Sequence, residues 1–120
     1  DQWCDLHTDF MNILIINMYP ERAGLHGTGY DSIKHRTWII DHHVPKFMGY
    51  IEQELNNSKS KWIGNMELIS MADFCWYPTL CWLRDGTFDG VTCDTFNAYP
   101  NVSQFLSDVE TECSHKEATA

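Results

Sequence analysis

A serine and an aspartate three residues apart, Ser70 and Asp73, open the most apolar stretch of the chain, ELISMADFCWYP. Such a pair could be a catalytic couple, part of a metal site, or the start of a helix. Hydroxyl catalysis needs a nearby base, and no histidine lies within twenty residues on either side. In a capping box, by contrast, each of the two side chains accepts a hydrogen bond from the other residue's amide. Ile69 and Phe74 fall at the two positions of a hydrophobic staple, so the sequence predicts a structural role for all four residues.

Three other groups of reactive side chains are present, and none has the spacing of a known site. Residues 41–43 are Asp-His-His with His35 nearby, but adjacent histidines on a helix point about 100° apart and do not easily share one metal ion. Residues 85–90 lack the ligand spacing and closing glutamate of a calcium loop, and are expected to end a helix. Cys75 and Cys81 have no basic neighbour to lower a thiol pKa, so neither is expected to be a nucleophile.

Aspartates also recur every four residues at the start of the chain, at positions 1, 5 and 9. On a helix they share one face, where like charges at this spacing destabilise the helix by about 0.2–0.5 kcal/mol per pair. A cation, a basic group of a partner, or water alone could compensate this repulsion. Asp5 and Asp9 are therefore candidates for a metal or partner contact, with a solvated face as the simpler alternative.

The elements that carry these residues are all predicted to be helical. Residues 3–18 have apolar side chains at helical spacing, and Tyr19-Pro20 ends that segment. Residues 20–35 are expected to form a loop, followed by a helix over 40–55 in which Pro45 marks either a kink or the first turn of a new helix. Further helices are predicted over 70–84, 90–98 and from Pro100 onward. The sequence thus predicts an all-α domain over residues 1–113 and a polar, frayed tail over 114–120, with fraying beginning near Glu112.

Composition narrows the classes of function. A net charge of −9, from 17 acidic and 8 basic residues, disfavours binding to nucleic acid or to anionic membranes. No apolar run approaches the roughly 18–20 residues of a membrane span. Five cysteines, an odd number without a CxxC pair, suit free thiols in a reducing intracellular compartment, cytoplasmic or organellar. No targeting segment is visible, and a chain that starts at aspartate is expected to be a fragment or a processed product.

Four stretches together resemble one family. WIGNMELISMADFCWY (62–77) resembles the segment that leads into the sixth helix of glutathione transferases, where Ser/Thr-x-x-Asp opens a buried helix. VPKFMGYIEQEL (44–55) resembles that family's fifth helix, and AYPNVSQFLSDVE (98–110) its closing helix. DQWCDLHTDFMN (1–12) is similar to the fourth helix of the sigma-class branch, which includes haematopoietic prostaglandin D synthase. The resemblance predicts a C-terminal helical domain of about five helices, without the thioredoxin-like half that supplies the catalytic residue.

The resemblance also implies roles for residues of the first helix. Asp9 matches the aspartate that reaches across a dimer to the amino group of the partner's glutathione, so glutathione is an implied ligand, although no cofactor is firmly indicated. Positions matching Asp5 and Asp9 lie near a divalent-cation site in some members, but Thr8 replaces an acidic residue there, which argues against metal. Phe10, Met11 and Ile15 match positions that line the hydrophobic substrate pocket, and core packing explains the same pattern.

Two functions follow as hypotheses. The preferred one is a non-catalytic docking module or accessory subunit, which contacts a protein partner, or a second copy of itself, through the first two long helices. The alternative is the hydrophobic-substrate-binding half of a sigma-like transferase that conjugates or isomerises small electrophiles with glutathione. The chain alone is not expected to catalyse thiol transfer, and would do so only when completed by a thioredoxin-like domain.

Overall fold

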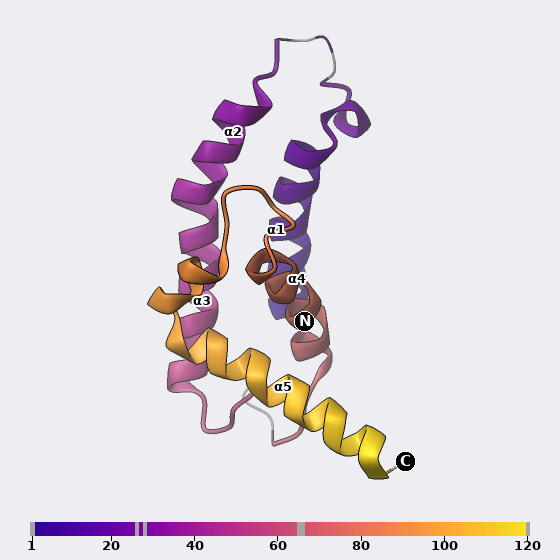
Figure 1. The fold of residues 1–120 in the computed structure, drawn as a ribbon, viewed down its shortest axis with the longest axis vertical. Coiled ribbons are helices and arrows are strands. Elements are labelled where there is room, and N and C mark those ends of the chain that lie inside the picture. The colour runs from indigo at the N-terminus through magenta and orange to yellow at the C-terminus, as the bar shows by residue number, and fades with distance from the viewer. Residues whose placement is uncertain (1, 26, 28, 65–66, 120) are drawn as a thin grey trace.

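The protein is a bundle of helices, shown in Figure 1 as a computed structural model that describes residues 2–25, 27, 29–64 and 67–119, with side chains described as far as Ser114. The elements follow one another as α1 (Gln2–Met18), η1 (Pro20–Ala23), α2 (Ser32–Trp38), η2 (Ile39–His43), α3 (Val44–Asn57), α4 (Met71–Arg84), η3 (Cys93–Ala98) and α5 (Pro100–Thr119). The described residues contain no strand, so the predicted all-α class is confirmed. None of the described helices has the combination of length and apolar character that crossing a bilayer requires.

Two long arms form the body of the bundle. α1 runs along one side, and α2, η2 and α3 form a single continuous arm on the other, antiparallel to it (Figure 1). α4 packs against α1, while α5 crosses the lower end of the bundle and contacts α3 and α4. α1 and α3 therefore contact the C-terminal part of the chain mainly through α4 and α5, respectively.

The second arm begins earlier than the sequence predicted. Residues 32–35 were expected to be loop, but α2 starts at Ser32 because the Asp31 carboxylate accepts a hydrogen bond from the amide of Lys34 at 3.0 Å. This Asp–Ser–x–Lys start has no apolar periodicity behind it, which is why the helical pattern did not reveal it. The continuous arm formed by α2, η2 and α3 therefore includes residues 32–35 of the predicted loop as well as the predicted helix over 40–55.

Pro45 lies in the first turn of α3, and a π-helical turn precedes it. A proline inside a regular α-helix has no amide to donate, and its ring collides with the carbonyl four residues earlier. Here the wider turn brings the Val44 amide onto the Ile39 carbonyl, five residues back. The backbone thus passes the proline without a break. Of the two sequence alternatives, the second is confirmed: an α-helix begins with Pro45 in its first turn, and the π-helical turn joins it directly to the helix before it.

The carboxylate of Glu52 on α3 fixes the start of α5. It accepts hydrogen bonds from the amide of Asn101, at 2.9 Å from each oxygen, and from the amide of Val102 at 3.1 Å. A negative charge at a helix N-terminus also interacts favourably with the helix dipole. α5 is helical as far as Thr119, past residue 113, the predicted end of the domain, and fraying of the polar tail stays a prediction.

The core lies where α1, α3, α4 and α5 meet. Phe10 is fully buried and stacks on Phe47 with ring centroids 4.7 Å apart. The centroid of the Trp76 ring lies 6.0 Å from that of the Phe10 ring. Gly90 lets the loop after α4 approach the second arm: its φ is 95°, and an added Cβ would lie 2.5 Å from Cδ1 of Ile40. Both features hold the long arms in a fixed relation to α4.

Candidate functional site

The predicted glutathione and metal residues lie along α1. Asp5 and Asp9 are both exposed on this helix, while Asp1 lies outside the described residues. Thr8 donates from Oγ1 to the Cys4 carbonyl at 3.1 Å and thus faces its own helix. No group of three or more His, Cys, Asp or Glu in the described part of the chain is placed to hold a metal ion. The exposed carboxylate of Asp9 could accept an ammonium group from a ligand or partner, and its role stays a prediction.

The predicted substrate-pocket residues have different surroundings. Phe10 has 0% of its surface exposed and belongs to the aromatic core, so it presents no surface to a ligand. Met11 is half-buried against the core, and its sulfur accepts a hydrogen bond from Thr79 Oγ1 at 3.4 Å. Ile15 is also half-buried. Of the three, only Met11 and Ile15 have surface available for an apolar ligand, and their pocket role stays a prediction.

The contact between α1 and α4, here called the α1–α4 seam, contains polar groups that sequence spacing did not reveal. The sulfur atoms of Cys4 and Cys75 lie 3.4 Å apart. One residue along, Trp76 Nε1 donates to the Trp3 carbonyl at 2.9 Å. One turn further, His7 Nε2 lies 2.6 Å from Thr79 Oγ1, and burial lowers the pKa of this histidine.

Ser70 and Asp73 lie at the start of α4 and form a capping box. Asp73 is fully buried, and its Oδ2 accepts from the Ser70 amide at 2.7 Å and from Ser70 Oγ at 3.1 Å. Its Oδ1 accepts from the amide of Ile63 at 2.7 Å, ten residues earlier. Ile69 packs against the core, whereas Phe74 keeps 49% of its surface exposed. Asp73 therefore joins the preceding loop to α4 in addition to capping the helix.

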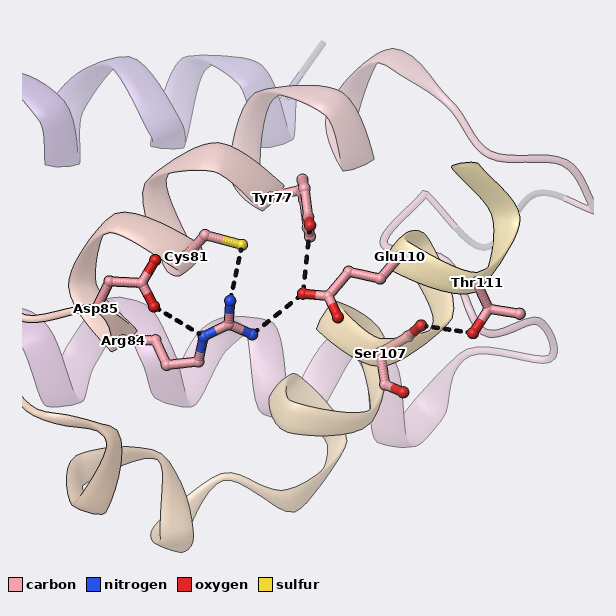
Figure 2. A network of polar contacts seen from close by, with 7 residues as sticks. All are labelled: Tyr77, Cys81, Arg84, Asp85, Ser107, Glu110 and Thr111. Carbon is pink, nitrogen blue, oxygen red and sulfur yellow. Dashed lines mark hydrogen bonds and ion pairs between the residues drawn. The ribbon is translucent and has the colours of Figure 1, made fainter. Parts of the chain in front are cut away.

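A second polar network joins α4 to α5 (Figure 2). Glu110 Oε1 accepts from Tyr77 Oη and from Arg84 Nη1, each at 3.3 Å. Arg84 also donates to Asp85 Oδ1 at 3.3 Å and points Nη2 at Cys81 Sγ, 3.7 Å away. Burial raises the pKa of the Cys81 thiol, despite the neighbouring guanidinium, and also raises the pKa of Tyr77. The arrangement fastens two helices and does not activate Cys81 as a nucleophile.

Two of the three histidines of the second arm, His35 and His42, contact neighbouring residues of the same arm or the loop before it. His42 stacks on Trp38 with ring centroids 3.7 Å apart, and its Nδ1 lies 3.1 Å from the Trp38 carbonyl. His35 Nδ1 is hydrogen-bonded to Tyr30 Oη. Nδ1 of His43 is buried without a hydrogen-bond partner, and burial lowers the pKa of this residue. The three rings thus have separate surroundings.

In the turn at residues 85–90, Asp89 pairs with Arg36 at 3.5 Å and Gly86 turns the chain with a φ of 82°.

Three surface hollows in the described part of the chain are large enough for side chains of a partner, and the smallest of them, of about 460 Å³, lies on α5. The first, here called the α1–α3 groove, has a volume of about 480 Å³. Its walls come from the N-terminal half of α1 and the C-terminal half of α3: Gln2, Trp3, Leu6, Tyr50, Gln53, Glu54 and Asn57. The second hollow, of about 640 Å³, lies over α2 beside the Trp38–His42 stack. The α1–α3 groove lies on the two long helices that are predicted from the sequence to contact a partner.

Comparison with known proteins identifies the family. The model of the glutathione S-transferase C-terminal domain matches residues 26–114, about three quarters of the chain. No curated protein and no solved structure gave a significant match. The chain therefore belongs to the family of glutathione S-transferase C-terminal domains, and the matched residues include α2, η2, α3, α4, η3 and most of α5.

Proposed function

We propose that this helical domain is a non-catalytic docking module or accessory subunit whose partner polypeptide binds along the α1–α3 groove. The observation that carries the proposal is the groove itself, in which the aromatic and aliphatic side chains of Trp3, Leu6 and Tyr50 line a surface hollow. Tyr50 keeps 44% of its surface exposed, although it follows a buried core segment of α3. Tyrosine and tryptophan are enriched where proteins bind one another, because they bury a large area at low entropic cost.

The charge around this groove indicates what the partner presents. Glu54 lies in the groove wall, and Asp5 and Asp9 are exposed on the same helix as Trp3 and Leu6. The chain as a whole carries a net charge of −9. A partner with an apolar centre and a basic rim would complement this surface, and such complementarity raises the rate of association.

A second exposed apolar surface supports a role inside a larger assembly. It lies at the start of α4 and is here called the α4 patch: Leu68, Met71 and Phe74. These side chains keep 79%, 69% and 49% of their surface exposed, respectively. Clustered apolar exposure of this kind typically marks a protein contact. An accessory subunit that contacts neighbours at two places would use both this patch and the groove.

The alternative is the substrate-binding half of a sigma-like transferase. It is favoured by the exposed Asp9 carboxylate, which could accept the amino group of a glutathione held by a partner. Half-buried Met11 and Ile15 would supply apolar surface to a small electrophile. The burial of Phe10 counts against this alternative, because one of its three predicted pocket residues is fully committed to the core.

Site-specific cross-linking tests the docking proposal. A photoreactive side chain in place of Tyr50 should capture a partner at fixed stoichiometry, and Leu6→Glu should abolish the complex. Ile33→Glu is the matched control, since Ile33 is 72% exposed on α2, outside the groove wall. Sedimentation of the same variants distinguishes a second copy of the chain from a different protein. Equal capture by the groove variant and the control, or a chain that stays monomeric and captures nothing, would overturn the proposal.

A separate experiment tests the alternative. The chain should pass through immobilised glutathione without retention and should not conjugate glutathione to 1-chloro-2,4-dinitrobenzene. Retention that Asp9→Asn removes, with the helical circular dichroism unchanged, would favour the transferase alternative over the docking module.

A further inference from the structure

The α1–α4 seam contains two cysteines that are remote in sequence and adjacent in space. All five cysteines are free thiols, but Cys4 and Cys75, 71 positions apart, bring their sulfur atoms within 3.4 Å. Both are half-buried, so a small reagent can reach them. Cys93 and Cys113 are exposed on η3 and α5, and Cys81 faces Arg84.

The residues on either side hold this pair in register. Trp76 donates to the carbonyl of Trp3, so the immediate neighbours of both cysteines are hydrogen-bonded to each other at 2.9 Å. One turn further along both helices, His7 and Thr79 are in contact at 2.6 Å. These two contacts fix the relative position of α1 and α4 around the sulfurs. Fixed proximity gives the second thiol a high effective concentration toward an intermediate formed on the first.

We propose that Cys4 and Cys75 are a redox modification site, in which a small hydroperoxide oxidises the two thiols to a disulfide that links α1 to α4. In the first step one cysteine loses its proton and the thiolate sulfur attacks a peroxide oxygen, so that the O–O bond breaks and sulfenic acid forms. The departing hydroxide (or alkoxide, if the peroxide is organic) takes up the proton that the thiol lost and leaves as water (or an alcohol). In the second step the other thiol attacks that sulfur, the S–O bond breaks, and a second water leaves. The two cysteines lose two electrons and two protons, and the peroxide is reduced.

The geometry permits the bond with a small movement. A disulfide has an S–S length of about 2.05 Å, so the sulfurs must approach by about 1.3 Å. Side-chain rotation at two half-buried residues supplies such a movement more readily than a shift of the hydrogen-bonded helices would. The hydrogen bond to Cys75, together with burial, raises the pKa of the Cys4 thiol. Cross-linking should therefore accelerate as the pH rises from 7 toward 9, because the thiolate is the reactive form.

Mass spectrometry of the full chain tests this proposal. Reduced protein treated with hydrogen peroxide should become a monomer lighter by about 2 Da, and dithiothreitol should restore the original mass. Trypsin then gives one linked pair of peptides, residues 1–22 with residues 62–84. Because the second peptide also contains Cys81, fragment ions must place the link at Cys75.

Serine variants give matched controls. Cys81→Ser, Cys93→Ser and Cys113→Ser, singly or together, should keep the 2 Da loss, while Cys4→Ser or Cys75→Ser should abolish it with the helical circular dichroism retained. The oxidised protein should also unfold at a higher temperature than the reduced protein, and this difference should vanish in Cys4→Ser. Added oxygen on single cysteines, links through Cys81, or disulfide-linked dimers in place of the intramolecular bond would overturn the proposal. The result depends on these thiols alone, so it is independent of the docking test.

Discussion

Replacing Asp73 by alanine should destabilise the protein more than the loss of a helix cap alone. The carboxylate accepts three hydrogen bonds, two from Ser70 and one from the Ile63 amide, and it is fully buried. Loss of a cap costs about 1 kcal/mol. A buried amide left without its acceptor costs about 1–3 kcal/mol more. We therefore expect Asp73→Ala to lower the free energy of unfolding by about 3 kcal/mol, the sum of ~1 for the cap and ~2 for the Ile63 amide.

Urea unfolding followed by tryptophan fluorescence measures this loss. Trp62 is buried beside Ile63 in the sequence, and Trp76 is buried one helical turn after Asp73. The emission of both therefore reports on the structure around Asp73. At roughly 4 °C per kcal/mol for a domain of this size, the thermal midpoint should fall by about 12 °C. The slope of the urea dependence should stay unchanged, because the surface exposed on unfolding is the same.

Ser70→Ala is the matched control for this prediction. It removes the serine hydroxyl from the cap and leaves the Asp73–Ile63 hydrogen bond in place, so it should cost only about 1 kcal/mol. Asp73→Asn should fall between the two, since its amide nitrogen cannot accept a hydrogen bond from the backbone. Equal losses for Asp73→Ala and Ser70→Ala would refute the additional role of the Ile63 contact. If Asp73→Ala left stability untouched but removed a bound ligand, the structural role itself would be wrong.

Three further predictions concern other parts of the fold. Gly90→Ala should cost about 1–3 kcal/mol in urea unfolding, because its φ of 95° disfavours a residue with a Cβ and the Ile40 side chain, 2.5 Å from that Cβ, would have to move. Gly49→Ala, with open space around it, should gain about 0.5–1 kcal/mol. Equal effects of the two changes would contradict this. Glu52→Gln should lower stability by about 1–2 kcal/mol by weakening the charged cap of α5, and Glu54→Gln on the same helix should be near neutral. His7 has a lowered pKa, so the unfolded chain binds its proton first; stability should be complete above about pH 6.5 and fall as the pH drops toward the folded pKa, by at most about 1.4 kcal/mol per pH unit. His7→Asn should flatten this dependence, and an unchanged slope would show that this ring does not cause it.

The sequence was sufficient for the features that depend on near neighbours along the chain. Helical spacing of apolar residues identified the long helices, and the Ser70–Asp73 spacing indicated a helix start because both partners lie within one turn. The resemblance of the sixth-helix segment also pointed to the family that the model of residues 26–114 identifies. Local signals failed at Ser32, where no apolar period marks the start of the helix.

Contacts between distant residues were decided only by the tertiary structure. The Asp73 carboxylate reaches the Ile63 amide in the loop before α4, Glu52 caps a helix that begins 48 positions later, and Cys4 meets Cys75 across the α1–α4 seam. Phe10 shows the same limit, because helical spacing cannot distinguish a core side chain from one that lines a pocket. The physical reason is common to all four: one-dimensional periodicity gives the face of a helix, but only packing against other helices determines what that face contacts.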